Sequence, residues 1–359
     1  MPAPIALVTG VHPDAMAVLT VALQWDLPRT VAVRHVIHVD RQVLERVVSD
    51  VTGVVERTEI ALEHACVTCA VREDVVPTLR RLASAGRWES VVAHLPVGAD
   101  ARQVCRGLAD DSVAARRPRV ASVLVGVDAV AAEPDLVGDD LLRERGLHAS
   151  TDDGRGVAEV LARLIEYADA AVLVGGRTTT GVGLVETLAR PGSHVLADVA
   201  ELDARRLVGE GRHRPEEALA WAAPDRRAPL PDVTAPGVWR VDLRSDRPFH
   251  PDRLLADIAT LGGGSHRSRG CFWLPTRPDR MCAWDGAGGQ LSIGIEGGWR
   301  PARPHTRIVI TGTGQQPPHL AEAFESMLVT EPELGTRGTV WEAGEDGFEP
   351  WLGPLHRAA

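Results

Sequence analysis

The first two-thirds of the chain alternates short apolar runs with amphipathic stretches. The apolar runs predict strands at residues 5–9, 30–34, 36–39, 90–94, 120–125, 170–174 and 194–197. The stretches between them show helical spacing at residues 72–85, 101–109, 156–167 and 183–189. Strands that alternate with helices indicate an α/β fold, in which a parallel sheet is covered by helices on both faces.

The pattern changes after a proline-rich stretch at residues 223–237. Beyond it, strands are predicted at residues 238–243, 271–274, 291–295 and 307–310, and helices at 251–261 and 319–328. This order is typical of a small α+β domain on an antiparallel sheet. The sequence therefore predicts a first domain at 1–225, a linker at 226–237, a second domain at 238–330 and a loosely held tail at 331–359, rich in Gly, Pro and Glu.

The amino-acid composition argues against DNA and membrane partners. The chain of 359 residues contains no lysine and no asparagine, and its 39 arginines stand against 49 acidic residues for a net charge of −10. A globally acidic protein is a poor non-specific binder of nucleic acid, so we expect no DNA partner. No apolar run approaches the roughly 18 residues of a membrane helix, so no membrane partner is expected either.

Five cysteines are spread over the chain, and residues 1–20 lack the basic start and cleavage site of a signal peptide. We therefore expect a cytoplasmic protein with reduced thiols. In that setting, cysteines favour metal or redox roles over structural disulfides.

Four ordered segments resemble the CobW family of P-loop GTPases, which are metal chaperones and metal-homeostasis factors. Residues 247–254 resemble the entry into the family's C-terminal domain, and 267–274 resemble its Arg-x-Lys-Gly-x-x-Trp-Leu strand. Residues 127–129 and 167–169 match in the first domain. The resemblance implies a P-loop-like parallel sheet with flanking helices, followed by a small α+β CobW C-terminal domain.

The departures from the family concentrate where GTP would bind. The P-loop position runs from Gly10 to Ala17, with Met16 in place of the lysine and Ala17 in place of the Mg²⁺-binding Ser or Thr. Asp14 adds a carboxylate that repels phosphate. The chain without lysine or asparagine also has no Asn-Lys-x-Asp guanine reader, since residues 174–177 occupy that place. We expect a vestigial nucleotide loop, no GTP and no enzymatic activity.

A second loop, at residues 176–181, follows a predicted strand and precedes a predicted helix. This context suits an anion at a helix N-terminus, but it is equally that of an ordinary strand-to-helix turn.

Cys66 and Cys69 are the residues most suited to a functional site. The family's metal-binding Cys-x-Cys-Cys motif falls here, and this chain has Thr68 in place of the middle cysteine. Two thiolates three residues apart can grip one tetrahedral ion, and sulfur favours zinc. The predicted helix start at Arg72 should lower the thiol pKa. A redox switch and inert packing are the alternatives.

Further residues extend the pair to a possible four-ligand zinc set, which consists of Cys66, Cys69, Cys105 and one of His64 or His94. His64 is next to the pair in the chain, and His94 and Cys105 flank a loop at the carboxyl end of a strand, where open α/β sheets bind ligands. The alternatives are a core histidine at His94 and a buried apolar thiol at Cys105. The remaining thiols and three tryptophans are predicted core residues of the second domain: Cys271, Cys282, Trp273, Trp284 and Trp299.

One branch of the family fits best. The Cys-x-x-Cys version, the His94-Leu-Pro segment and the eroded P-loop resemble actinobacterial members that are made under zinc starvation and recruit a hibernation-promoting protein to ribosomes. This resemblance implies an adaptor whose partners are the ribosome and a hibernation factor. Arginine clusters at residues 116–119, 205–206 and 266–269 are either rRNA phosphate contacts or solvated surface. A GTP-dependent zinc metallochaperone and a thiol redox sensor are the alternative functions.

Overall fold

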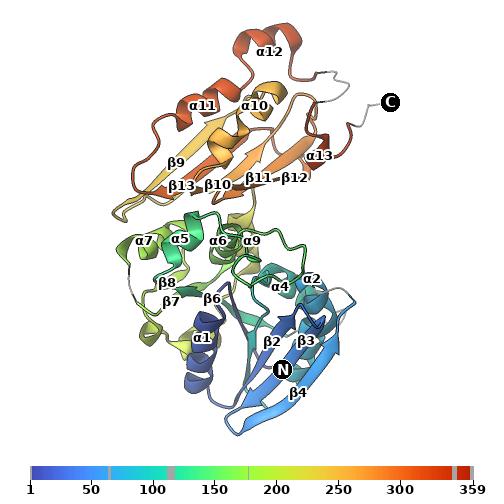
Figure 1. Ribbon diagram of the computed structural model, residues 1–359, viewed down its shortest axis with the longest axis vertical. Coiled ribbons are helices and arrows are strands. Elements are labelled where there is room, and N and C mark those ends of the chain that lie inside the picture. The colour runs from blue at the N-terminus through green and yellow to red at the C-terminus, as the bar shows by residue number, and fades with distance from the viewer. Residues whose placement is uncertain (1, 64–65, 111–117, 177, 342–345, 356–359) are drawn as a thin grey trace. The chain divides into compact units, whose positions relative to one another are not determined.

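The computed structural model describes residues 2–63, 66–110, 118–176, 178–341 and 346–355. The chain divides into two compact units (Figure 1). The first contains Met1–Asp135 and Asp140–Ala222, and the second contains Leu136–Asp139 and Ala223–Ala359. The predicted linker at 226–237 thus belongs to the second compact unit.

The sheet of the first unit has eight strands among the described residues, in the order β4-β3-β2-β5-β1-β6-β7-β8. Six of them, from β2 to β8 in this order, run parallel, and β3 and β4 continue the sheet as antiparallel strands. The strands are β1 Ile5–Gly10, β2 Thr30–His38, β3 Val43–Asp50, β4 Gly53–Ala61, β5 Ser90–His94, β6 Val120–Asp128, β7 Ala170–Val174 and β8 His194–Leu196.

Helices cover both faces of this sheet. The helices are α1 Pro13–Asp26, α2 Val67–Ala70, α3 Val76–Ser84, α4 Ala101–Ala109, α5 Ala132–Val137, α6 Val157–Tyr167, α7 Thr179–Leu188, α8 Ala204–Gly209 and α9 Pro215–Ala222. Helices α1 and α8 share one apolar cluster with the sheet, while α4 contacts both α3 and α6. Every residue of β1 is buried, as a central parallel strand requires. The predicted α/β architecture is confirmed.

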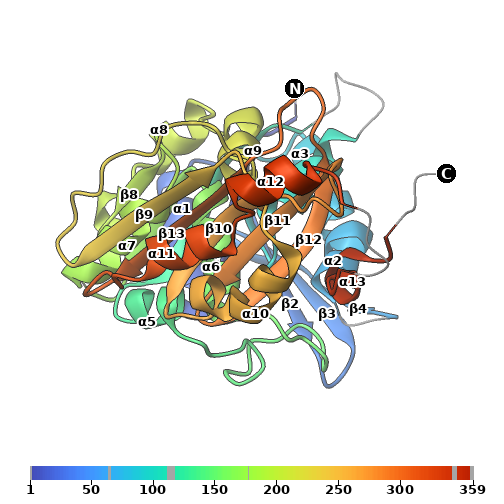
Figure 2. The ribbon, with the colours of Figure 1, turned by 90° about the horizontal axis from the view of Figure 1, so that it is seen from above.

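The second unit is an antiparallel sheet with helices on one face (Figure 2). Its strands, in the order β12-β11-β10-β13-β9, are β9 Val238–Ser245, β10 His266–Phe272, β11 Arg280–Ala287, β12 Gln290–Gly298 and β13 Thr306–Thr313. Helices α10 Pro251–Gly262 and α11 Leu320–Met327 pack on it through one apolar core that includes Phe249, Phe272 and Trp284.

Gly270 explains why the family-like strand motif carries a glycine. It lies in β10, where that strand pairs with β13. A Cβ at this position would stand 1.7 Å from the carbonyl oxygen of Arg307, so no larger residue fits. The glycine therefore permits the close approach of the two central strands.

The prediction of a loosely held tail is wrong for residues 346–352, which pack into the second unit. Helix α12 spans Glu331–Arg337, and α13 spans Glu349–Leu352. Phe348 is fully buried in the core of the second unit, and the buried Arg277 donates to Asp346 at 2.9 and 3.1 Å. The tail is poor in apolar residues, but Phe348 and Leu352 are placed in the core.

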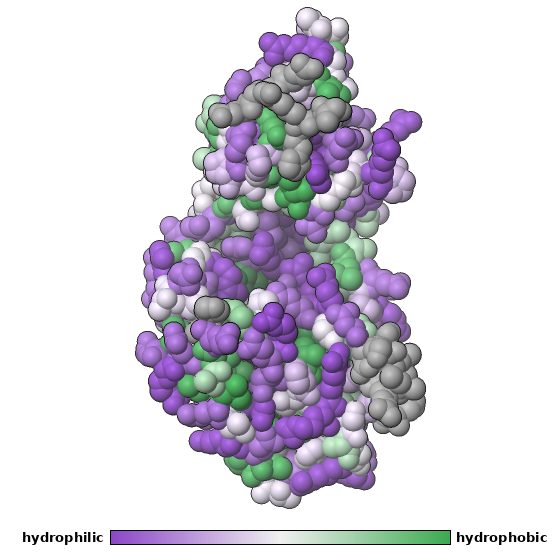
Figure 3. Space-filling model, turned by 90° about the vertical axis from the view of Figure 1, so that its right-hand side faces the viewer, coloured by the Kyte–Doolittle hydropathy of each residue, from purple (hydrophilic) through white to green (hydrophobic). Residues whose placement is uncertain are grey.

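Hydrophilic residues dominate the face of the molecule in Figure 3, with hydrophobic residues scattered among them. Within the described ranges, no helix has the length and apolar character needed to cross a bilayer.

Candidate functional site

The P-loop position is too short to wrap around a phosphate. Strand β1 ends at Gly10 and α1 already begins at Pro13, so only Val11 and His12 lie between them. A P-loop presents the backbone N–H groups of a longer loop to phosphate oxygens. Here Pro13 has no N–H, and the N–H of Met16 donates within the helix to the carbonyl of His12 at 3.1 Å.

Met16 points into the core rather than toward a ligand. Its side chain is fully buried in a cluster with Val8, Leu19 and Leu23. A Cβ at Gly10 would lie 3.0 Å from the Met16 Cγ, which shows how closely this side chain lies beneath the loop. Met16 is therefore a packing residue of the first unit.

The imidazole of His12 is held by an internal carboxylate. Its Nε2 pairs with Asp135, whose side chain is fully buried and also pairs with Arg145. The segment after β5 closes against the same strand end, because Gly98 N–H donates to the Gly10 carbonyl at 2.8 Å. Of the other vestigial residues, Asp14 is exposed in the first turn of α1 and Ala17 is half-buried.

His94 is a core histidine at the end of β5, one of the two interpretations from the sequence. It is 5% exposed, and its Nδ1 lies 3.0 Å from the hydroxyl of Thr20. Burial lowers the pKa of His94 to about 4, and the charges of Arg34 and His35 act in the same direction. The ring is therefore neutral at physiological pH.

The loop at 176–181 is an ordinary helix start where it is described. Thr178 is the N-cap of α7, and its hydroxyl accepts the N–H of Gly181 at 3.2 Å. The cap uses an N–H that an anion would need. Arg177 lies outside the described residues.

Cys66 and Cys69 are brought together by a helix start. Cys66 is the N-cap of α2, and its Sγ accepts the N–H of Cys69 at 3.2 Å. Both thiols are half-buried. A π-helical turn at Val71–Val75 follows and leads into α3. Such turns are frequent at functional sites.

The prediction that the helix start lowers the thiol pKa is wrong for Cys69. The hydrogen bond with Cys66 and partial burial raise the pKa of the Cys69 thiol, and the neighbouring Glu73 adds to the effect. The two sulfur atoms compete for one proton, which disfavours ionisation of the Cys69 thiol. A cation between them would remove that competition.

Cys105 does not join the pair. Its Sγ lies 3.6 Å from Nε2 of His213, whose Nδ1 lies 3.0 Å from the Asp169 carboxylate. The Tyr167 hydroxyl lies 3.4 Å from the same Nε2. Burial raises the pKa of the Cys105 thiol to about 12, so this Cys-His-Asp arrangement holds a protonated thiol and not a nucleophile.

The predicted four-ligand zinc set is therefore not assembled. Across the part of the chain that the structure describes, no three His, Cys, Asp or Glu side chains form a group that could hold a metal ion. Cys105 is engaged with His213, and His94 with Thr20. His64 lies outside the described residues, so its role stays a prediction.

The structure also tests the predicted core residues of the second domain and the arginine cluster at 266–269. The core assignment of the remaining thiols and tryptophans is confirmed, since each is at most 6% exposed: Cys271, Cys282, Trp273, Trp284 and Trp299. The cluster at 266–269 is neither exposed nor free for phosphate, because Arg267 and Arg269 are buried on β10 and Arg267 pairs with Asp285. Arg116 and Arg117 lie outside the described residues.

Comparison with known proteins agrees with this fold. Residues 238–328 match the family model of the cobalamin synthesis protein CobW C-terminal domain. A Mycobacterium tuberculosis protein named zinc chaperone Rv0106 is 29% identical over 374 residues, which cover 90% of this chain and 87% of that protein. The Dictyostelium discoideum zinc-regulated GTPase metalloprotein activator 1 is 20% identical over 265 residues, covering 68% and 56%.

Among solved structures, the Zn(II)-bound YjiA GTPase from E. coli is similar with a TM-score of 0.35 and 16% identity, over 91% of this chain and 99% of that one. The second unit is thus similar to the CobW C-terminal domain, and the chain as a whole is similar to proteins named for zinc and GTP.

Proposed function

We propose that this chain is a non-hydrolytic zinc-homeostasis adaptor of the CobW family. The observation that carries the proposal is the contrast between two places in the first unit. At the P-loop position Met16 is buried in the core and His12 pairs with Asp135, while Cys66 and Cys69 lie at one helix start and are half-exposed. The functional site of the protein is then the thiol pair Cys66 and Cys69.

We propose that Cys66 and Cys69 bind zinc, either as a cargo or as a signal. Two thiols three residues apart at one helix start can both reach one tetrahedral ion, and soft sulfur selects zinc over hard cations. Two ligands leave positions open on the metal, which suits transient binding or completion of the site by a partner protein. The names of the similar proteins support zinc as the metal.

Metal analysis of the purified protein tests the zinc site. We expect about one zinc per chain after exposure to zinc and removal of excess, and loss of that zinc in the variant Cys66→Ser/Cys69→Ser. Cys105→Ser is the matched control, because that thiol pairs with His213 and should not affect zinc. Equal zinc in the double variant and the wild type would refute the assignment.

The proposed partners are the ribosome and a hibernation-promoting factor. The support is the resemblance of the Cys-x-x-Cys pair, the His94-Leu-Pro segment and the eroded P-loop to the zinc-starvation branch of the family. Cosedimentation with ribosomes, with and without the factor and zinc, tests this step. Association that is absent, or unchanged by zinc and by Cys66→Ser/Cys69→Ser, would exclude the adaptor role.

A GTP-dependent zinc metallochaperone is the second candidate. It is favoured by the relative named as a zinc-regulated GTPase metalloprotein activator. It requires GTP hydrolysis above background that is lost on altering residues 10–17. Hydrolysis with that dependence would replace the adaptor proposal.

A further inference from the structure

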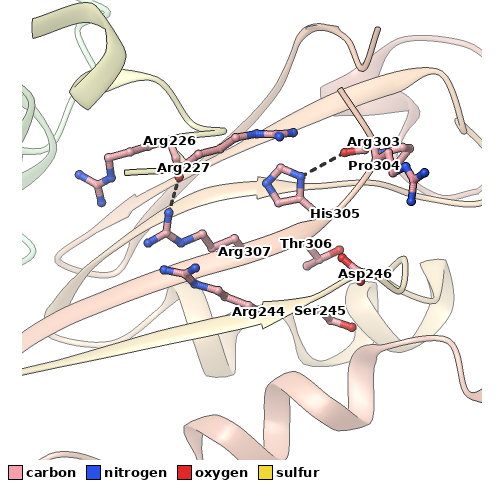
Figure 4. Close-up of a pocket in the computed structure, with 10 residues that line it drawn as sticks. All are labelled: Arg226, Arg227, Arg244, Ser245, Asp246, Arg303, Pro304, His305, Thr306 and Arg307. Atoms are coloured by element: carbon pink, nitrogen blue, oxygen red, sulfur yellow. Dashed lines mark hydrogen bonds between the residues drawn. The ribbon is translucent and has the colours of Figure 1, made fainter. Parts of the chain in front are cut away.

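A cavity of about 440 Å³ opens on the second unit, away from the sequence motifs described above (Figure 4). It lies among the first residues of the unit, the end of β9 and the segment that leads into β13. Its lining consists of Arg226, Arg227, Arg244, Ser245, Asp246, Arg303, Pro304, His305, Thr306 and Arg307. This volume is in the range of small-molecule sites, roughly 300–1,000 Å³.

The lining is strongly cationic in a chain with a net charge of −10. Five of its ten residues are arginines, and only Asp246 is acidic. Asp242 pairs with two of these arginines, and Asp225 precedes Arg226 in the chain. Even with these two carboxylates counted, the arginines are in excess, so the cavity attracts anions.

Part of the site is held rigidly. Arg307 is 4% exposed, and its Nε and Nη2 donate to Asp242 at 2.8 and 2.7 Å. Its Nη1 donates to the carbonyl of Arg226 (Figure 4). Arg244 faces Arg307 directly across the β9–β13 pairing. These contacts fix the guanidinium group of Arg307, next to the more exposed Arg244, before any ligand arrives.

The other part of the site is adaptable. Arg227 and Arg303 are exposed, and neither has an ion-pair partner within the described ranges. Their guanidinium groups are free to close on an anion, and arginine matches the oxygens of phosphate with paired hydrogen bonds. His305 lies in the same lining, with its Nδ1 3.3 Å from the Arg303 carbonyl.

We infer that this cavity binds a small phosphate-bearing anion. A single carboxylate would neutralise only one of the arginines, whereas a pyrophosphate or a nucleotide phosphate chain matches several at once. The volume of about 440 Å³ favours a small molecule, and the acidic charge of the whole chain disfavours a nucleic-acid strand. The inference stands independently of the proposed zinc role, because no cysteine lines the cavity.

Calorimetric titration of the full chain with inorganic phosphate, pyrophosphate and GTP, at fixed ionic strength, tests the inference. We expect saturable pyrophosphate binding that weakens at least about tenfold in Arg227→Gln/Arg303→Gln, because both substitutions remove charge-assisted hydrogen bonds to the ligand. The control Arg143→Gln/Arg337→Gln removes the same charge from exposed positions elsewhere and should leave binding within about twofold.

The comparison of ligands identifies the source of the phosphate. Pyrophosphate and GTP with equal arginine dependence indicate a site for a bare phosphate chain, and GTP alone indicates a nucleotide site. No saturable binding by the wild type, or equal weakening in the control, would overturn the inference. Binding of a short RNA in place of the small anions, with the same arginine dependence, would also overturn it.

Discussion

Restoring the missing P-loop lysine should destabilise the first unit instead of creating a nucleotide site. Met16 is fully buried among Val8, Leu19 and Leu23, so the variant Met16→Lys places an amine in an apolar cluster. Neutralising a lysine with an ordinary pKa of about 10.4 at pH 7 costs about 4.6 kcal/mol, at about 1.36 kcal/mol per pH unit. The methylenes of lysine keep part of the packing, so this charge term dominates.

That cost approaches the whole stability of many domains, which is about 5–15 kcal/mol. The control Met16→Leu conserves volume and apolar character and should cost less than about 1.5 kcal/mol. Urea denaturation gives the overall loss, and hydrogen exchange of the β1 amides, from Ile5 to Gly10, assigns the loss to the first unit. Equal stability of the two variants would refute the buried placement of this side chain.

Three further outcomes follow from individual contacts. Asp346→Asn should destabilise the second unit by about 3–5 kcal/mol in urea denaturation, because the buried Arg277 loses its carboxylate. Burial alone would raise the pKa of Asp242, but hydrogen bonds from arginines, Arg307 first, lower it from 3.8 to about 2. The stability that the ionised carboxylate contributes is therefore complete above about pH 4 and is lost as the pH falls toward 2. In urea denaturation, the stabilities of the wild type and of Asp242→Asn should converge near pH 2. Cys105, whose pKa is about 12, should resist iodoacetamide at pH 8 in the native protein, while the half-exposed thiol pair reacts, as peptide mass mapping would show.

The parallel sheet was predictable because its central strands are continuous apolar runs bounded by turn residues. Helix α1 was not predicted, because its apolar residues surround the helix. Leu19 and Leu23 are buried while Val21 and Trp25 are exposed, so no amphipathic stripe appears in the sequence. The hairpin β3–β4 was also missed, since Gly53–Ala61 lies at an exposed sheet edge and has neither a long apolar run nor a regular alternation of apolar and charged residues.

The candidate site was predictable only where its parts are close in sequence. The spacing of Cys66 and Cys69 indicated adjacency, and a helix start supplies it. The partner of Cys105 is 108 residues away, and nothing local identifies His213. The carboxylate that holds His12 is likewise 123 residues away. Such pairings arise from the order of the strands in the sheet, which a pattern of local periodicities does not specify.

Hydrogen exchange of the backbone amides from Val11 to Ala17, with and without saturating Mg·GTP, tests most directly whether the old nucleotide position is closed. Because the readout is confined to the start of α1, it is insensitive to any anion held by the arginine-lined cavity. We predict identical exchange in both conditions. Protection of these amides by Mg·GTP would contradict the account, since it would place the triphosphate over Met16.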